Sequence, residues 1–250
     1  TGDAEEIGNA LLVDKRVRLI TFTGSTEVGK YLMRESAANV KKLSLELGGH
    51  APSIVFEDAD IDKATTLVLG SKFRNNGQTC ICTNRLYVHE AIKSSFTNLL
   101  KEKALKMKIG YGMEKGVELG PLINRAALEK VGSHVEDAIL KGSEIICGGK
   151  AWNSNLNGHF YEPTILSNVE DDMKVMNEET FGPIIPIQFF TDEAEVIQKA
   201  NNTDYGLAAY IFTENTNRSI RVSEKLDYGI VGVNDVFPAV PEAPFGGIKQ

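Results

Sequence analysis

The sequence predicts an α/β fold with a mostly parallel sheet, and two features of the chain support this prediction. Short runs rich in Val, Ile, Leu and Phe alternate with longer segments in which apolar residues recur every three or four positions. Strands that alternate with helices in this way usually build a parallel sheet covered by helices. A hydrophobic fraction of 42% and a charged fraction of 24% are ordinary for a globular chain, and 250 residues allow one or two domains.

The individual elements follow in chain order. An apolar run at residues 18–22 leads into Gly24 and is expected to be a buried strand, and apolar residues at helical spacing follow from Thr26. The glycine-rich segment 109–123 is expected to be a long connection, and Gly142 is expected to follow the end of a helix. We predict helices at residues 4–13, 26–39, 60–73, 91–107, 125–140, 193–201 and 216–226, and strands at residues 18–22, 42–47, 53–56, 85–89, 144–147, 184–190, 208–212 and 230–234.

The chain is expected to divide at the pair Gly48-Gly49, where it can turn sharply between two strands. Alternating strands and helices lie on both sides of this pair. Two domains are therefore predicted, residues 1–49 and residues 50–250.

The composition argues against several functional classes. A formal net charge of −7 with scattered Lys and Arg argues against a nucleic-acid or anionic-membrane surface. The sequence contains no run of 18 apolar residues that would predict a membrane span. Three cysteines, two of them separated by a single residue, do not form the framework of a secreted disulfide protein, so we expect a cytoplasmic protein.

The segment FRNNGQTCICTNR holds the strongest candidate for chemistry. Cys80 directly follows Gly77-Gln78-Thr79, a flexible polar segment that can expose a thiol and aim backbone N–H groups at it. Cys80 is therefore the candidate nucleophile, and a small buried hydrophobic residue is the alternative role. No histidine motif accompanies Cys80, which argues against a cysteine protease.

Cys82 lies two residues further on and suggests a redox role. In an extended backbone the two Cα atoms would lie roughly 6–7 Å apart, at the upper end of the disulfide range. We therefore hypothesise a reversible disulfide between Cys80 and Cys82. A zinc site does not fit a lone Cys-x-Cys pair without further paired ligands, so no metal is expected.

Glu46 is the candidate general base. It ends a run of alternating apolar residues and precedes two glycines, so a strand would deliver its carboxylate to a turn. A carboxylate held in a partly desolvated crevice is suited to deprotonate a water molecule. A solvated strand residue or an ion-pair partner is the alternative role.

The segment GSTEVGK matches the spacing of a phosphate-binding P-loop that follows a strand and opens a helix. However, Tyr31 follows the lysine at the position where magnesium coordination requires Ser or Thr, so a P-loop phosphotransferase is a remote alternative. Free N–H groups at a helix start near Ser25 still suit a pyrophosphate, and Gly24 and Gly29 would let a dinucleotide approach. A capped helix without a ligand is the third interpretation.

Five motifs occur in a fixed order along the chain: FTGSTEVGK at residues 22–30, LELGG at 45–49, GQTC at 77–80, EETFGP at 178–183 and PFGGIK at 244–249. Together they resemble the aldehyde dehydrogenase family, and the segment around Cys80 is most similar to its succinate-semialdehyde dehydrogenase branch. The resemblance covers essentially the whole chain, but family members extend further at both ends. We therefore expect a C-terminal-half fragment that lacks most of the cofactor domain and the C-terminal tail.

This resemblance implies that residues 1–49 end a Rossmann-like NAD(P)-binding domain and that residues 50–250 form the catalytic domain. It implies Cys80 as nucleophile, Glu46 as base in the crevice between the domains, NAD or NADP as cofactor, and a homo-oligomer, dimer or tetramer, for the complete protein. Glu179 would hold the nicotinamide ribose and Phe181 would pack near the ring. The implied cofactor-binding residues are Gly24, Ser25, Gly29, Leu47, Glu179 and Phe181.

Arg74 connects the sequence to a substrate class. Its planar fork, six residues before Cys80, suits a carboxylate, and a similar position does this in the succinate-semialdehyde branch. A serine found in some of those enzymes before PFGG is absent, and AVPEA occupies residues 239–243, which leaves the chain length of the substrate open. We predict NAD(P)-dependent oxidation of a small semialdehyde that bears a carboxylate, with succinate semialdehyde as the first choice. Glutarate semialdehyde, a broad range of aliphatic aldehydes and an inactive structural fragment are the alternatives, and the 250 residues alone are expected to be inactive.

Overall fold

The structure, a computed structural model, describes residues 1–152 and 156–250. The chain forms two compact units, Thr1–Gly48 and Gly49–Lys249, which we call the N-terminal and the C-terminal unit. Each unit has its own sheet, and each is described by itself. The assignment of the two units to a cofactor domain and a catalytic domain stays a prediction.

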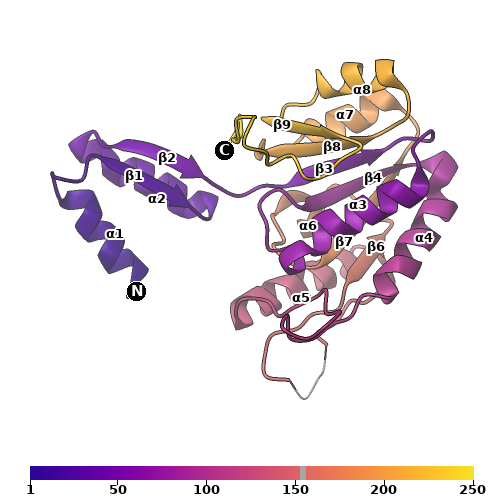
Figure 1. The fold of residues 1–250 in the computed structure, drawn as a ribbon, viewed down its shortest axis with the longest axis horizontal. Helices are drawn as coiled ribbons and strands as arrows, with labels where there is room; N and C mark the ends of the chain where they lie inside the picture. Colours follow the sequence, from indigo (N-terminus) through magenta and orange to yellow (C-terminus); the bar gives the residue numbers. More distant parts are fainter. Residues whose placement is uncertain (153–155) are drawn as a thin grey trace. The chain divides into compact units, whose positions relative to one another are not determined.

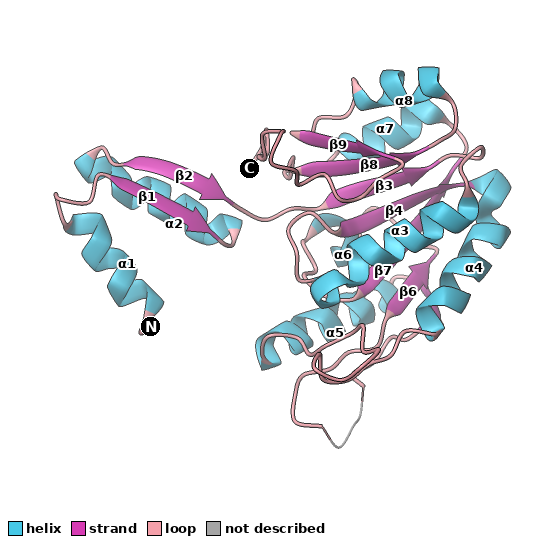
Figure 2. Cartoon of the chain, in the orientation of Figure 1, coloured by secondary structure: helices cyan, strands magenta, loops and turns pink. Residues whose placement is uncertain are grey.

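The N-terminal unit contains two parallel strands and two α-helices (Figure 2). Strand β1 pairs with β2 so that Phe22 lies opposite Leu45. The strand predicted at residues 18–22 was expected to be buried, and this expectation was wrong. Alternate residues of β1 are exposed, because its sheet has only two strands. The elements are α1 (Ala4–Val13), β1 (Leu19–Thr23), α2 (Thr26–Ser36), the 3₁₀ turn η1 (Ala37–Asn39) and β2 (Lys42–Glu46).

The C-terminal unit is built on a seven-stranded sheet with the order β5-β6-β7-β4-β3-β8-β9 (Figure 1). Every neighbouring pair is parallel except β5 and β6, which are antiparallel at one edge. The predicted α/β class with a mostly parallel sheet is confirmed. The strands are β3 (Ala51–Val55), β4 (Thr83–His89), β5 (Glu144–Cys147), β6 (Thr164–Ser167), β7 (Ile184–Phe190), β8 (Ala208–Phe212) and β9 (Ile230–Val233).

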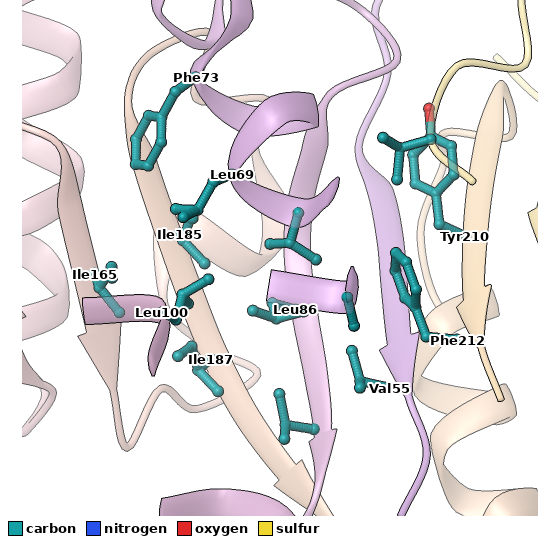
Figure 3. Packing of buried hydrophobic residues seen from close by; sticks show 14 of the residues in the cluster. Val55, Leu69, Phe73, Leu86, Leu100, Ile165, Ile185, Ile187, Tyr210 and Phe212 are labelled. Carbon is teal, nitrogen blue, oxygen red and sulfur yellow. The ribbon is translucent and has the colours of Figure 1, made fainter. Parts of the chain in front are cut away.

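Helices cover both faces of this sheet. Successive side chains of a strand point to opposite faces, so the apolar residues of each strand are buried by helices on both sides. Val55 packs in one buried cluster with α3 and α4, whereas its neighbour Ile54 packs in a second cluster with α5, α6, α7 and α8. Figure 3 shows the first cluster, in which Leu69 and Leu100 of the helices pack with Leu86, Ile185 and Ile187 of the strands. The helices are α3 (Ile61–Phe73), α4 (Lys93–Leu105), α5 (Arg125–Leu140), α6 (Lys174–Asn177), α7 (Glu193–Asn201) and α8 (Thr216–Ser223), with 3₁₀ turns η2 (Arg74–Gly77) and η3 (Glu90–Ile92).

The structure adds two short elements that we did not predict, strand β6 and helix α6. Each has four residues, which is too few for a period of two or 3.6 to be recognised. The predicted helix end before Gly142 is confirmed, since Lys141 is the C-cap and Gly142 has a φ of 96°. Because β3, β4 and β7 run parallel, the loop before β4 lies at the end of the sheet where these strands begin.

Candidate active site

The cysteine loop, residues 74–82, leaves α3 through three successive left-handed residues. Asn75, Asn76 and Gly77 have φ angles of 50°, 57° and 76°. Asparagine and glycine adopt this region at the lowest cost, so the sequence NNG suits this backbone. The Asn76 amide donates to the carbonyl of Gly120 at 2.9 Å. The loop is thereby fixed and presents a partly exposed Cys80.

Two other motifs meet the cysteine loop. A Cβ atom on Gly49 would lie 1.9 Å from the carbonyl oxygen of Cys80, so the two backbones are in direct contact. The N–H group of Gly49 donates to Oε1 of Glu179 at 3.0 Å. A Cβ atom on Gly77 would lie 2.2 Å from the carbonyl oxygen of Gly182. The segments around Gly49 and around Glu179 and Gly182, which lie far apart in the sequence, therefore meet at the cysteine loop.

A buried lysine ties the cysteine loop to the rest of the unit. Lys72 is 0% exposed, and its Nζ donates to Oδ1 of Asn84 at 2.8 Å and lies 3.7 Å from Sγ of Cys82. The Asn84 amide in turn donates to the carbonyl of Gly49 at 3.3 Å. Burial lowers the pKa of the Lys72 ammonium, and the electrostatic interaction with Cys82 opposes this shift.

The backbone between Cys80 and Cys82 is not extended, which is the geometry that the disulfide hypothesis assumed. The N–H group of Cys82 donates to the carbonyl of Thr79 at 3.3 Å, which closes a turn across these residues. Its thiol is buried and donates to the carbonyl of Gly77 at 3.4 Å. The disulfide with Cys80 stays a hypothesis, and the extended geometry that motivated it is absent.

Arg74 is exposed, and its guanidinium makes no hydrogen bond or ion pair with any residue that the structure describes. A hollow of about 10 Å³ lies beside it, lined in part by Thr79, Val236 and Phe237. This volume holds about one water molecule. Val236 and Phe237 follow β9, so the segment before PFGG helps to close the space next to Arg74.

The N-terminal unit holds the second group of predicted residues. The carbonyl of Glu46, the last residue of β2, accepts a hydrogen bond from the N–H of Gly24 at 3.0 Å. A Cβ atom on Gly29 would lie 2.6 Å from Cδ2 of Leu47. Packing of α2 against Leu47 therefore explains the missing side chain at Gly29, and its predicted role toward a dinucleotide stays a prediction.

The start of α2 lies in the same unit as an apolar hollow. Ser25 caps the helix by accepting from the N–H of Val28 at 3.4 Å. Oγ1 of Thr26 is buried and has no hydrogen-bond partner in the described part of the chain. The hollow has a volume of about 610 Å³, lies between α1, β1 and α2, and is lined among others by Gly8, Leu11, Ile20, Phe22, Val28 and Leu32.

The sequence patterns did not predict this hollow or the lysine network. Leu11 and Val28 are exposed apolar residues on helices, which was a signal for an uncovered surface. Lys72 lies between the buried residues Ser71 and Phe73, where a charge in an otherwise apolar helix end signals an internal partner. The partners themselves, Asn84 and the Gly49 carbonyl, come from segments that only the fold brings together.

The predicted site residues thus fall into two sets, one in each unit. Among the described residues, no group of three or more His, Cys, Asp or Glu side chains is arranged to hold a metal ion. The N-terminal unit carries Gly24, Ser25, Gly29, Glu46 and Leu47, and the C-terminal unit carries Arg74, Cys80, Cys82, Glu179 and Phe181.

Comparison with known proteins decides the family. Residues 1–250 match the sequence profile of the aldehyde dehydrogenase family. The chain belongs to the aldehyde dehydrogenase family. It is 51% identical over 249 residues to the NADP(+) succinate-semialdehyde dehydrogenase GabD of Escherichia coli, and 49% identical over 249 residues to a glutarate-semialdehyde dehydrogenase of Pseudomonas putida. Both alignments cover 100% of this chain and 51% of the relative.

Solved structures of aldehyde dehydrogenases agree with this assignment. The crystal structure of succinate-semialdehyde dehydrogenase from Burkholderia pseudomallei matches with a TM-score of 0.96 and 49% identity, over 100% of this chain and 51% of that chain. The chain therefore spans about half the length of the aldehyde dehydrogenases it matches. In the described residues, no helix combines the length and the apolar character needed to cross a bilayer.

Proposed function

We propose that this chain is the cysteine-bearing part of an NAD(P)-dependent dehydrogenase that oxidises a small semialdehyde to its acid. The observation that carries the proposal is the convergence of Gly49, Glu179 and Gly182 on the cysteine loop, together with family membership. Because the chain spans about half the length of its relatives, the activity is proposed for the full-length polypeptide that contains it. All experiments below refer to that polypeptide.

In the proposed mechanism, the Cys80 thiolate attacks the aldehyde carbon, and the resulting oxyanion is stabilised in part by the Cys80 backbone N–H. A nicotinamide ring bound near Cys80 would accept the hydride. Loss of hydride leaves a thioester on Cys80. Glu46 then removes a proton from a water molecule, which attacks the thioester carbon and releases the acid and the thiolate. This step requires Glu46 to reach the acylated cysteine.

The residues of the N-terminal unit fit a dinucleotide. The apolar hollow between α1 and α2 has the dimensions and the walls for a flat aromatic base. The start of α2 offers free N–H groups and the positive end of a helix dipole to a pyrophosphate, and the unpartnered hydroxyl of Thr26 lies at the same place. Glu179, which already accepts from Gly49, is the proposed ligand of the nicotinamide ribose, with Phe181 near the ring. The choice between NAD and NADP is left to the assay.

Arg74 supports a substrate that carries a carboxylate. Its guanidinium is exposed and makes no hydrogen bond or ion pair within the described residues, so its full donor fork is available to a ligand. The relatives named above act on succinate and glutarate semialdehyde, which carry a carboxylate at the far end. We propose succinate semialdehyde as the preferred substrate and glutarate semialdehyde as the second candidate. A dimer or tetramer and a cytoplasmic location are further proposals from the resemblance and the composition.

The test measures reduction of NAD+ or NADP+ by the full-length protein with succinate semialdehyde, glutarate semialdehyde or butyraldehyde as the substrate. We expect the highest kcat/KM for one of the semialdehydes and no activity in a Cys80→Ala variant with unchanged unfolding temperature. Full activity of Cys80→Ala would refute the proposed nucleophile. ATP turnover without aldehyde oxidation would instead favour the P-loop alternative.

A further inference from the structure

We propose that His134 is a positioning residue that holds the cofactor loop, residues 178–182, in the shape needed by Glu179 and Phe181. The inference rests on the proposed function, since it assigns a purpose to a contact behind the predicted nicotinamide-ribose ligand. His134 itself lies on α5 and is 1% exposed, so it is not expected to touch cofactor or substrate.

Both ring nitrogens of His134 are bound to residues that flank Glu179. Nδ1 lies 3.2 Å from Oγ1 of Thr180, and Nε2 lies 3.2 Å from Oε2 of Glu178. A carboxylate can only accept, so Nε2 carries the proton and donates to Glu178, while Nδ1 accepts from the Thr180 hydroxyl. Burial lowers the pKa of His134, against the attraction of Glu178, and so favours this neutral ring. Each nitrogen thus fastens one neighbour of Glu179 to α5.

The backbone of the loop needs such support. Phe181 has a φ of 52°, in the left-handed region that bulky residues rarely adopt. A conformation of this kind persists only where the surroundings fix it, and it is often found at functional sites. The next residue, Gly182, packs against α5 as well, because a Cβ atom there would lie 2.3 Å from Cγ2 of Val131. Val131 and His134 lie one turn apart on α5, so two successive turns of the helix contact the loop.

The loop conformation that His134 supports determines where Glu179 lies. Glu179 stands between the two residues that His134 holds, and its carboxylate accepts from the N–H of Gly49. Gly49 in turn touches the Cys80 carbonyl. Without His134 we expect Phe181 to relax toward an ordinary backbone conformation and to carry Glu179 away from this arrangement. Cofactor binding and hydride transfer should suffer, whereas the nucleophile on its own loop should keep its intrinsic reactivity.

The test separates cofactor-dependent from cofactor-independent chemistry. His134→Phe keeps an aromatic ring of similar size but removes both hydrogen bonds, and Ser133→Ala changes the neighbouring, partly exposed residue of α5 as a control. Two readouts are compared. The first is cofactor binding, measured as the KM for NAD(P)+ and as the dissociation constant of the reduced cofactor. The second is the rate of p-nitrophenyl acetate hydrolysis at Cys80 without cofactor. We expect His134→Phe to weaken cofactor binding about tenfold, from two lost hydrogen bonds, and to leave ester hydrolysis within twofold.

Two further variants guard against a misfolded protein. His134→Gln keeps an N–H donor for Glu178 and should restore part of the cofactor affinity. Thr180→Val removes one bond with little change of volume and should show a smaller effect in the same direction. Unchanged cofactor affinity in His134→Phe and Thr180→Val would overturn the inference, as would equal losses of ester hydrolysis and dehydrogenase activity. Absence of aldehyde oxidation in the unmodified protein would refute the proposed function instead.

Discussion

Replacement of Gly49 by alanine should displace the nucleophile. The new Cβ would lie 1.9 Å from the Cys80 carbonyl oxygen and 3.0 Å from its carbon, and both partners are backbone atoms that cannot rotate away. The backbone segments around Gly49 and Cys80 must separate by about 1 Å, because packed interiors have no spare volume at such a contact. The hydrogen bond from Gly49 to Glu179 would be strained by the same movement.

The expected magnitudes follow from this displacement. Overpacking of this kind costs about 1–3 kcal/mol, which lowers the unfolding temperature of a unit of this size by about 2–12 °C. A misplacement of about 1 Å at a reacting group costs about 10²-fold in rate. Gly49→Ala should therefore lower kcat/KM for the aldehyde about 10²-fold and slow p-nitrophenyl acetate hydrolysis as well, since the cysteine loop itself moves.

Gly132→Ala is the matched control. Apart from the neighbouring residues and the backbone of α5 itself, no atom of the described residues lies within 4 Å of a Cβ atom on Gly132, which sits inside helix α5. Alanine there should stabilise the protein by about 0.5–1 kcal/mol and leave the kinetics unchanged. Activity of Gly49→Ala within twofold of the original protein, with an unchanged unfolding temperature, would refute the close contact between Gly49 and the cysteine loop.

Two further predictions concern the substrate and the second cysteine. Arg74→Met should lower kcat/KM for succinate semialdehyde by roughly ten- to two-hundredfold, the value of a charge-assisted contact of about 1.5–3 kcal/mol, and should spare butanal. Arg74→Lys should restore only part of this loss, and an equal penalty for both aldehydes would mean that Arg74 shapes the loop rather than binds a carboxylate. Peroxide should inactivate the protein reversibly if Cys80 and Cys82 form a disulfide, so Cys82→Ala should lose the recovery by thiol reductant. Full recovery of Cys82→Ala would exclude this pair as the switch.

The sequence predicted the helix and strand order of this chain because the signals are local. The helix predicted at residues 125–140 coincides with α5, since Asn124 caps its start and Gly142 adopts the left-handed conformation after its end. Strands β7 and β8 likewise match their predicted ranges, because continuous apolar runs of this length are typical of buried parallel strands.

The contacts behind the candidate site could not be predicted in the same way. Lys72 and Asn84 are twelve residues apart, and His134 and Glu178 are 44 apart, so only the fold brings each pair together. The burial of β1 was predicted wrongly for a related reason. Burial depends on which elements cover a strand, and a sequence segment alone does not specify its neighbours.

The most direct test of the account is to trap the acyl-enzyme. Glu46→Gln should still let Cys80 attack the aldehyde and let the former aldehyde carbon lose its hydride to the cofactor, but it should slow hydrolysis of the resulting thioester. After mixing with NAD(P)+ and succinate semialdehyde, we expect a rapid burst of reduced cofactor that matches the number of active sites. Mass spectrometry should then locate one succinyl group on the peptide that contains Cys80. A burst with the acyl group on another residue, or equal loss of the burst and of steady-state turnover in Glu46→Gln, would contradict the proposed roles of Cys80 and Glu46.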